Sequence, residues 1–503
     1  MRLPPGFHKA TEIEAITTED MRAIEINATH LGTPLTLLME NAGNAIASFL
    51  EWYLGGAGGL RVQILSGKGG NGGDGLSAAR RLANRGAKVT VHLTHKPPEI
   101  THPSTLDMYR LLVESEVKIY TPGDEEWLAL DDADALVDAV LGVGVKGGLR
   151  GNVRRSVEAY NSASGLRVSV DVPTGLDPDS GYAAEGTARS DYTITMHKPK
   201  PGLMTGKARV YSGEVLVAEI GIPRNAEVYA GPGDVYARIP DKPRDAHKGT
   251  GGKVLIVGGS NEYVGAPVFS SLAAYAAGAD LVFLAAPFSR EASLRYPEIV
   301  PRGLETVEDL VPRVHSIVVG PGLGEREDLL LRVIEAAKRN NKATVIDADG
   351  LKILARSKSI SLNENFVLTP HRGEAKLLLG LRELPRVVEA AKRIASRYNA
   401  TALIKAPEDA VCSPSGYCRL NREGAPEMSV GGTGDVLAGV IGAFLARRKA
   451  LGLKPDALNT AAAALYVVGK AGSQAVSKTG LALPSMIINE IPQVIASSKK
   501  LPA

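Results

Sequence analysis

The sequence contains only two cysteines, Cys412 and Cys418, in a chain of 503 residues. Two thiols cannot supply the disulfide framework on which small secreted domains depend. They flank the segment CSPSGYC, which predicts a hairpin, and we expect both to be free thiols in a reducing cytosol. The fold must therefore be held together by its buried apolar side chains.

Long apolar runs and blocks of like charge are absent as well. No stretch approaches roughly 18 uninterrupted apolar residues, and the N-terminus MRLPPGFHKATEIEA has no apolar signal-peptide core. The formal net charge is only +3, without a basic run long enough for a nucleic-acid footprint. We therefore expect a cytoplasmic protein that binds neither a membrane nor nucleic acid.

The length and the alternation of apolar runs predict two α/β domains. A chain of 503 residues exceeds one ordinary core. After two helical patterns between residues 17 and 53, short apolar runs alternate with helical segments, as in a doubly wound parallel sheet. The runs are LRVQILSG, AKVTVHLT, ADALVDAVLG, LRVSVDVP and DYTITM, then KVLIVGGS, ADLVFLAAP, HSIVVGPG, ATVIDADG, NFVLTP and TALIKA.

Regularity fades between about residues 222 and 245, where proline, glycine and mixed charge predict a linker or a boundary strand. We therefore expect one domain at 1–225, a Rossmann-like doubly wound α/β fold, and a second at 226–503.

The segment GKGGNGGDG at 67–75 follows a predicted strand and opens a predicted helix. Gly67, Gly69 and Gly72 match the G-x-G-x-x-G pattern of dinucleotide-binding turns. The next predicted strand ends VHLTH, without the acidic residue that binds a ribose. This absence argues against a plain NAD oxidoreductase.

Polar residues also follow two more strands of the first domain. Asp138 ends one of them, and Asp171 and Thr174 follow the next. Because ligands bind outside the carboxyl ends of parallel strands, these residues and Asn71 are expected to converge on one pocket. Hard oxygen ligands of this kind suit K⁺ or Mg²⁺ better than zinc.

The motifs of the first half resemble the YjeF N-terminal family, the NAD(P)H-hydrate epimerases. They are MENAG (39–43), NGGDG (71–75), DAVLGVGVKGGLRG and VDVPTGLD. The resemblance implies that Asn71, Asp138 and Thr174 hold K⁺, and that Asp171 contacts substrate and acts in catalysis. It also implies a substrate-binding set of Gly70, Asn71, Gly72, Gly73, Asp74, Gly142, Val143, Gly144, Val145, Lys146, Gly147 and Gly148. The family usually has N-N-G-G-D, and this chain has Gly70 in place of the first Asn.

In the second half, residues 428–440 read MSVGGTGDVLAGV, a glycine loop and one carboxylate at the start of an apolar helix. Glycines let backbone N–H groups approach an anion, and a helix N-terminus favours negative charge. A carboxylate beside such a phosphate site suits a general base that takes the proton of an attacking hydroxyl. No G-x-x-x-x-G-K-[ST] motif occurs, so this is not a P-loop enzyme.

The pieces HKGTGGKVLIVGGS, GPGLG, DADGL, LTPHRGE and GGTGD resemble the ribokinase-like superfamily. His371 stands where sugar kinases carry the Asn of N-x-x-E, and this pattern is similar to the ADP/ATP-dependent NAD(P)H-hydrate dehydratases. The resemblance implies that the nucleotide, with Mg²⁺, phosphorylates the C6 hydroxyl of the hydrated nicotinamide ring in its S form, after which phosphate leaves.

The same resemblance implies the site residues of the second half. Asp435 would be the catalytic base, and Ala266, Gly322, His371 and Asp435 would contact the hydrated substrate. The adenine nucleotide, ADP or ATP, would contact Lys405, Ala406, Pro407, Glu408, Asp409, Gly432, Thr433 and Gly434. The family usually has K-G-x-x-T where this chain reads Lys405-Ala-Pro-Glu-Asp409.

The leading hypothesis is a bifunctional repair enzyme acting on NADHX and NADPHX, the hydrated nicotinamide nucleotides, and we expect a homo-oligomer. One alternative is a ribokinase-like small-molecule kinase with a sensor domain, which would accumulate a phosphorylated product. Another is that the first half is a non-catalytic interaction module.

Overall fold

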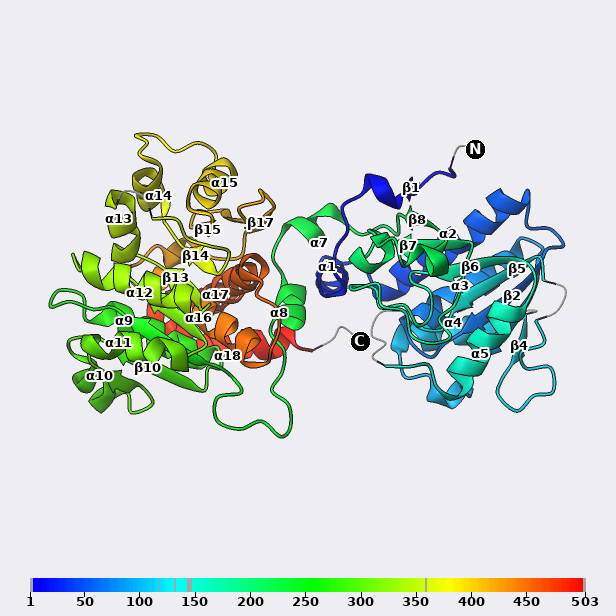
Figure 1. The fold of residues 1–503 in the computed structure, drawn as a ribbon, viewed down its shortest axis with the longest axis horizontal. Helices are drawn as coiled ribbons and strands as arrows, with labels where there is room; N and C mark the ends of the chain where they lie inside the picture. The colour runs from blue at the N-terminus through cyan, green and yellow to red at the C-terminus, as the bar shows by residue number, and fades with distance from the viewer. Residues whose placement is uncertain (1–2, 116, 131–132, 143–146, 358–359, 501–503) are drawn as a thin grey trace. The chain divides into compact units, whose positions relative to one another are not determined.

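A computed structural model describes residues 3–115, 117–130, 133–142, 147–357 and 360–500 of the chain. These residues form two α/β units, the first ending at Pro223 and the second beginning at Arg224 (Figure 1). The domain division that we expect after residue 225 lies inside α7 (Arg224–Val228).

The sheet of the first unit has the strand order β1-β8-β7-β6-β5-β2-β3-β4. Strands β2 to β8 pair in parallel, and only β1 at one edge is antiparallel to its neighbour β8. The order reverses between β2 and β5, so the chain leaves these two strands in opposite directions. The strands are β1 (Phe7–Lys9), β2 (Arg61–Ser66), β3 (Lys88–Leu93), β4 (Lys118–Tyr120), β5 (Ala135–Ala139), β6 (Leu166–Val170), β7 (Tyr192–Met196) and β8 (Glu214–Ala218).

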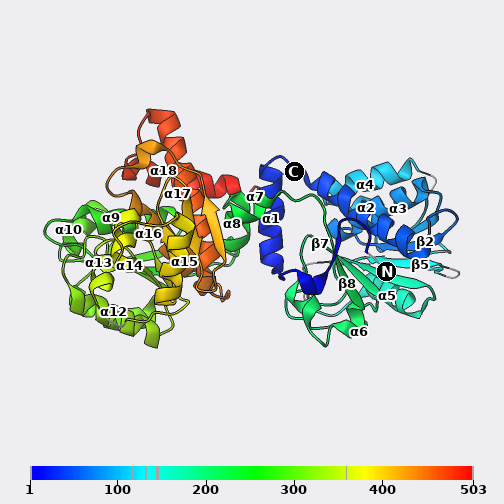
Figure 2. The same ribbon diagram turned by 90° about the horizontal axis from the view of Figure 1, so that it is seen from above.

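Helices cover both faces of this sheet, with α2, α3 and α4 on one face and α5 on the other (Figure 2). The MENAG motif packs α2 on α3, because a Cβ at Gly43 would lie 2.3 Å from Oγ of Ser77. The helices are α1 (Thr18–His30), α2 (Leu35–Leu54), α3 (Gly70–Asn84), α4 (Pro103–Val113), α5 (Gly151–Ser162) and α6 (Arg209–Ser212).

The sheet of the second unit has the order β11-β10-β9-β12-β13-β14-β15-β16-β17. Strands β9 to β15 are parallel, and β16 and β17 add an antiparallel hairpin at one edge. The strands are β9 (Lys253–Val257), β10 (Leu281–Ala285), β11 (Val300–Arg302), β12 (Ser316–Val319), β13 (Ala343–Ile346), β14 (Phe366–Leu368), β15 (Thr401–Ile404), β16 (Asp409–Cys412) and β17 (Cys418–Asn421). The order reverses between β9 and β12.

Two apolar cores lie on the two faces of this second sheet, one beneath α9, α16, α17 and α18 and one beneath α12 to α15. Helix α16 is apolar on all sides because other helices and the sheet surround it. The helices are α8 (Pro232–Arg238), α9 (Gly265–Ala276), α10 (Ser289–Arg295), α11 (Val307–Leu310), α12 (Glu327–Arg339), α13 (Asp349–Arg356), α14 (Arg372–Leu379), α15 (Val387–Tyr398), α16 (Thr433–Ala450), α17 (Ala457–Thr479) and α18 (Pro484–Ser498).

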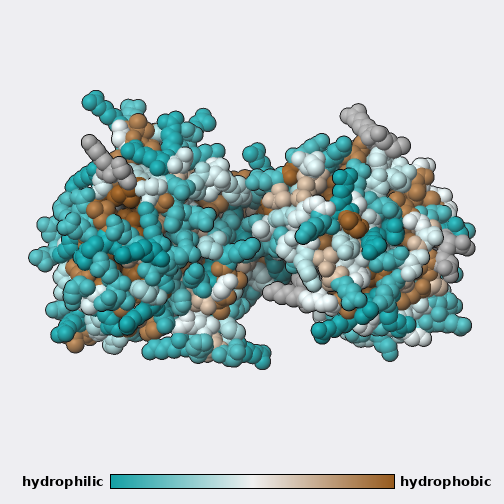
Figure 3. All heavy atoms as spheres, in the orientation of Figure 1, coloured by the Kyte–Doolittle hydropathy of each residue, from teal (hydrophilic) through white to brown (hydrophobic). Residues whose placement is uncertain are grey.

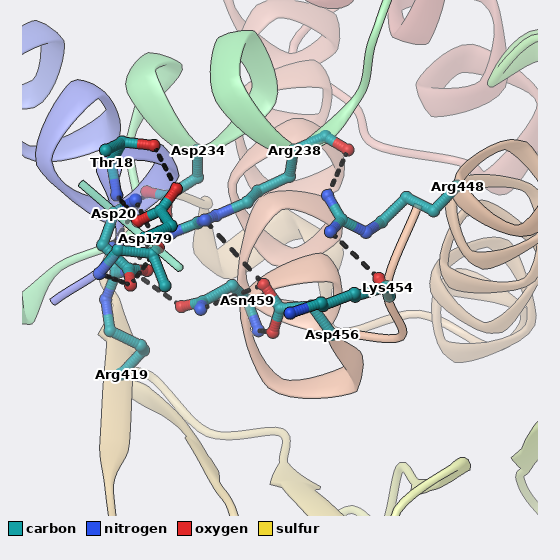
Figure 4. A network of polar contacts seen from close by, with 11 residues as sticks. Thr18, Asp20, Asp179, Asp234, Arg238, Arg419, Arg448, Lys454, Asp456 and Asn459 are labelled. Atoms are coloured by element: carbon teal, nitrogen blue, oxygen red, sulfur yellow. Dashed lines mark hydrogen bonds and ion pairs between the residues drawn. The ribbon is translucent and has the colours of Figure 1, made fainter. Parts of the chain in front are cut away.

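The segment predicted as a linker or boundary strand contains two short helices, α7 and α8. A buried ion pair fastens α8 to the edge hairpin: both terminal nitrogens of Arg419 lie 2.9 Å from the carboxylate of Asp234 (Figure 4). Arg419 also donates to Asn459 at 3.1 Å. The hairpin that follows Lys405 is therefore anchored to the helical layer.

The expectation of two free thiols is wrong. Cys412 and Cys418 are direct partners in the β16–β17 ladder, with Cα atoms 4.1 Å apart, and they form a disulfide. Antiparallel pairing of the strands brings the two sulfur atoms together, which a reading of spacing alone did not take into account.

No helix of the described residues is long and apolar enough to cross a membrane. Hydrophilic residues cover most of the face drawn in Figure 3, and apolar residues appear there in small groups.

Candidate active sites

The first unit leaves the start of α3 open at the carboxyl end of β2. Gly69 is the N-cap of α3, and no side chain caps the helix. A Cβ at Gly69 would meet nothing within 4 Å, and one at Gly70 only the ring of His102 at 3.9 Å. The first N–H groups of α3 are therefore available to an anionic ligand.

The other glycines of this loop are needed for packing. A Cβ at Gly72 would lie 1.8 Å from the carbonyl oxygen of Gly67, and one at Gly73 would lie 2.4 Å from the sulfur of Met39. Both contacts are too close for any larger residue. Gly72 and Gly73 thus let the turn and α2 approach α3, while Gly70 faces open space.

Asp138 at the end of β5 is buried and accepts four hydrogen bonds. Its donors are Oγ1 of Thr174 at 2.6 Å, the N–H of Thr174 at 2.8 Å, Ser169 at 2.9 Å and the N–H of Val140 at 3.3 Å. Burial raises the pKa of Asp138, and these bonds oppose the rise. The carboxylate fixes the loop that carries Thr174.

Asn71 is the remaining residue of the predicted potassium set. Its side-chain oxygen and nitrogen are buried, and neither has a hydrogen-bond partner among the described residues. A Cβ at Gly142 would lie 3.6 Å from Oδ1 of Asn71, and the N–H of the preceding Leu141 donates to Oγ1 of Thr174 at 3.0 Å. Asn71, Asp138 and Thr174 therefore border the same short segment.

The loop that follows is described only in part. Val143, Gly144, Val145 and Lys146, which the family resemblance assigns to substrate, lie outside the described residues. Gly147 and Gly148 are described, and a Cβ at either would meet nothing within 4 Å.

Asp171 follows β6 with an unusual backbone. Its φ is +60°, in the left-handed region that Asp and Asn tolerate better than most residues. Oδ1 accepts hydrogen bonds from Oγ1 of Thr195 at 3.0 Å and from the N–H of Met196 at 3.2 Å, and it pairs with Lys200. The turn thus places the carboxylate against the end of β7.

In the second unit, the glycine loop ends at the start of α16. Gly432 is the N-cap with φ of +99°, and a Cβ there would lie 2.7 Å from Pro484. No side chain caps the helix, and Oγ1 of Thr433 donates to the carbonyl of Val430 at 3.1 Å. The N-terminus of α16 is therefore available to an anion, as the sequence predicts.

Asp435 lies in the first turn of α16 among other charges. Burial raises its pKa to about 7, the carboxylate of Asp347 adds to the rise, and the cation of Lys405 opposes it. Nζ of Lys405 lies 3.1 Å from Asp347 and 2.8 Å from the position of a Cβ at Gly434. A base that titrates near neutrality thus stands beside a cation at a helix N-terminus.

The predicted substrate contacts Ala266 and Gly322 are neighbours. A Cβ at Gly322 would lie 3.5 Å from Cβ of Ala266 and 2.7 Å from Cβ of Tyr263. Farther along α9, Oγ of Ser270 donates to the carbonyl of Asp435 at 2.8 Å. The start of α9 is therefore fixed to the start of α16.

His371 has a clear structural role. Its Nδ1 accepts the N–H of Gly373 at 2.9 Å, so the ring caps α14. Glu374 completes the capping box by accepting the N–H of His371 at 3.0 Å. The side chain remains 59% exposed, and its Nε2 lies 3.5 Å from Oε1 of Glu374.

The two acids of the 405–409 segment bind protein donors. Asp409 accepts the N–H of Ala406 at 2.9 Å and the side-chain amide of Asn421 at 2.9 Å. Glu408 accepts the hydroxyl of Tyr229 at 2.7 Å. These carboxylates are thereby directed to protein donors, which reduces the conflict with a nucleotide phosphate.

Each unit thus places an open helix N-terminus and buried carboxylates at the carboxyl ends of its parallel strands. This combination is typical of an α/β enzyme that binds anionic ligands. Residues 35–202 match the family described as YjeF-related protein N-terminus, and residues 254–493 match NAD(P)H-hydrate dehydratase. The chain belongs to the family of bifunctional NAD(P)H-hydrate repair enzymes, as the motifs predict.

Two relatives carry this resemblance over the whole length. The bifunctional NAD(P)H-hydrate repair enzyme Nnr of Hyperthermus butylicus is 40% identical, covering 97% of this chain and 94% of its own. That of Archaeoglobus fulgidus is 39% identical, covering 97% and 100%. Among solved structures, hypothetic protein SMU.573 from Streptococcus mutans is 25% identical with a TM-score of 0.50, over 54% of this chain and 100% of its own.

Proposed function

We propose that this chain repairs hydrated nicotinamide nucleotides in two steps, and that each unit performs one of them. The first unit interconverts the R and S forms of NADHX and NADPHX. The second dehydrates the S form with ADP or ATP and releases phosphate. The observation that carries the proposal is Asp435, a half-buried base with a pKa of about 7 at an uncapped helix N-terminus.

For dehydration, Asp435 would accept the proton of the C6 hydroxyl while that oxygen attacks the terminal phosphoryl group. The N–H groups of α16 and the cation of Lys405 would stabilise the charge on the transferred group. Phosphate would then leave C6 with the electron pair of the C6–O bond, and loss of a proton from C5 would form the C5=C6 double bond of the dihydronicotinamide ring.

Mg²⁺ would neutralise charge on the nucleotide phosphates. Among the described residues, no group of three or more His, Cys, Asp or Glu side chains could hold a metal ion alone. We therefore propose that Mg²⁺ enters with the nucleotide, which is its usual mode of binding.

The pKa of Asp435 predicts how dehydration depends on pH. Only the ionised carboxylate can accept a proton, and burial raises its pKa to about 7 in the free chain. We expect kcat/KM for dehydration to rise about tenfold per pH unit below about pH 7 and to level off above it. A profile that is flat between about pH 5 and 8 would show that another group limits the reaction.

We propose that K⁺ binds beside Asn71, Asp138 and Thr174 in the first unit. The support is the buried oxygen of Asn71, which has no partner among the described residues. A monovalent cation takes such neutral oxygens as ligands, and when bound it would contribute positive charge near the substrate.

Asn71→Leu tests this site. We expect the variant to lose any K⁺ dependence of epimerisation and of the melting temperature, with epimerase kcat falling about 10–100-fold. Asn84→Leu, farther along the same helix, is the matched control. Retention of a K⁺ response in Asn71→Leu would place the ion elsewhere.

The proposed function as a whole is tested with an epimeric mixture of NADHX, ADP or ATP, and Mg²⁺. We expect full return of reduced-nicotinamide absorbance, with phosphate released in step. Recovery that stops with one epimer left would reduce the first unit to an interaction module. A phosphorylated product without phosphate release would favour the small-molecule kinase.

The setting of this activity is also a proposal. Nicotinamide nucleotides and ADP or ATP are metabolites of the cytoplasm, so we propose that the chain works there on small molecules, without nucleic acid or membrane. We also propose a homo-oligomer, which sedimentation of the purified chain would test.

A further inference from the structure

Four ionisable side chains from separate segments of the first unit interact electrostatically near the end of β6. They are Glu25 of α1, Asp74 of α3, Asp171 after β6 and Lys200 after β7. Burial raises the pKa of Glu25 to about 7 and that of Asp74 well above its usual range. The carboxylate of Asp171 adds to both rises, and the cation of Lys200 opposes them.

Lys200 is the most deeply buried member, with a side chain that is 0% exposed. Its Nζ donates to Oδ1 of Asp171, to Oγ1 of Thr195 at 3.1 Å and to the carbonyl of Met196 at 3.3 Å. A buried ammonium is costly unless it is paired and hydrogen-bonded in this way. Lys200 is therefore held in one place by the end of β7.

Within the described segments, the hydrogen bonds to the carboxylate of Asp171 all go to one of its two oxygens, Oδ1. Oδ1 accepts from Thr195, from the N–H of Met196 and from Lys200. Among the described residues, none donates to Oδ2. One oxygen is thus anchored in the protein, and the other is free for a ligand.

Among the described residues, Asp171 is the acid of this cluster that pairs with Lys200. In the described part of the chain, the carboxyl groups of Asp74 and Glu25 make no hydrogen bond, and Lys200 pairs directly only with Asp171. Burial raises the pKa of Glu25 and lowers the pKa of His102. The cation of Arg22 of α1 is a smaller influence that lowers both. Lys200 is therefore paired with one of the three carboxyl groups, that of Asp171.

We propose that Lys200 is a positioning residue of the epimerase site, which holds Asp171 in place as the base and leaves Asp74 and Glu25 to act as acids. The inference rests on the proposed epimerase function and adds a division of roles among the acids. Neither Lys200 nor Glu25 belongs to the glycine-rich motifs of the sequence.

Both routes to epimerisation need such a division. In ring opening, a base takes the proton of the C6 hydroxyl as the C6–N1 bond breaks, and an acid protonates N1. In elimination and addition, an acid protonates the departing hydroxyl while the lone pair of N1 forms a C6=N1 iminium, and a base then takes a proton from the water that adds back to C6. Asp171 would be the base in either route, and Asp74 or Glu25 the acid.

Lys200→Met tests the proposal, with Lys207→Met at an exposed position as the matched control. We expect epimerase kcat to fall about 10²–10⁴-fold with little change in KM. The acid limb of the pH profile should move upward by about 1–3 pH units, because a carboxylate without its neighbouring cation takes up a proton more readily.

Two features of this experiment separate positioning from folding. Dehydration of the pure S epimer by the same variant reports whether the chain is intact. The milder Thr195→Val, which removes one hydrogen bond to Asp171, should move the acid limb in the same direction by less. An acid limb that stays in place in Lys200→Met overturns the proposal, whatever happens to kcat.

A readout without substrate keeps this inference distinct from the proposed function. In the full chain with ¹⁵N-labelled lysine, the ammonium signal of Lys200 is assigned by its loss in Lys200→Met. We expect that signal to shift in Asp171→Asn and to change little in Asp74→Asn or Glu25→Gln. A shift seen only in Asp74→Asn or Glu25→Gln would show that Lys200 pairs with one of those two acids instead. This result can be interpreted even if the wild-type chain has no epimerase activity.

Discussion

Asp435→Asn is expected to abolish dehydration of the S epimer and to leave epimerisation intact. Asparagine keeps the shape of the side chain but cannot accept the hydroxyl proton, so phosphorylation at C6 should fall about 10²–10⁴-fold. The backbone carbonyl of residue 435 can still accept the hydrogen bond from Ser270, and the start of α16 should be preserved. Return of reduced-nicotinamide absorbance measures dehydration, and chromatographic separation of the two epimers measures epimerisation.

Asp328→Asn is the matched control, since Asp328 is an exposed acid in the first turn of α12. Both activities should survive in it. Loss of both activities in Asp435→Asn would contradict the assignment of one site to each unit. Full dehydration in that variant would require a different base.

Asp171→Asn is expected to have the reverse effect, with epimerisation lost and dehydration of the S epimer unchanged. Asparagine tolerates the left-handed backbone that residue 171 adopts, so the turn after β6 should survive. It removes the charge that Lys200 holds, and with it the base, so we expect epimerase kcat to fall about 10²–10⁴-fold. An epimeric mixture supplied with ADP or ATP should then stop when the S form is exhausted.

Asp107→Asn on α4 is a control with the same change of charge at an exposed acid. Complete recovery of the mixture in Asp171→Asn would remove Asp171 from catalysis. It would then favour the alternative that the first unit is an interaction module.

The local pattern of apolar runs and turn residues was sufficient to predict most strands of the two sheets. The predicted strands coincide with β2, β3, β5, β6, β7, β9, β10, β12, β13, β14 and β15, because each is a short apolar run closed by turn residues. The same regularity placed Asn71, Asp138 and Asp171 near one sheet edge, since the carboxyl ends of parallel strands share an edge. Gly432, Thr433 and Asp435 follow equally directly from a glycine loop before an apolar helix.

The residues of the site that the sequence did not predict are brought together by contacts between segments that are far apart in the chain. Glu25 lies on a helix outside the glycine motifs, and Lys200 belongs to the segment HKPK, which carries no catalytic pattern. Only the packing of α1 and the turn after β7 brings them to Asp171. A signal was present in the apolar neighbours of Glu25, because an acid within the run AIEINA on a buried helix face needs a partner or a proton.

The thiols and the 405–409 segment show the same limit. Spacing alone did not indicate that Cys412 and Cys418 face each other across a ladder, which is a property of strand register. Nor could it show that Glu408 and Asp409 satisfy donors within the protein.

The left-handed backbone at residue 171 limits which residue types fit that position without strain. Asp, Asn and Gly tolerate that conformation, whereas other residues are strained by about 1–3 kcal/mol. Gly and Asn would serve the turn at least as well as Asp, and each is one nucleotide change away. Of the residues that fit this backbone, Asp is the one that supplies a negative charge to pair with the buried ammonium of Lys200.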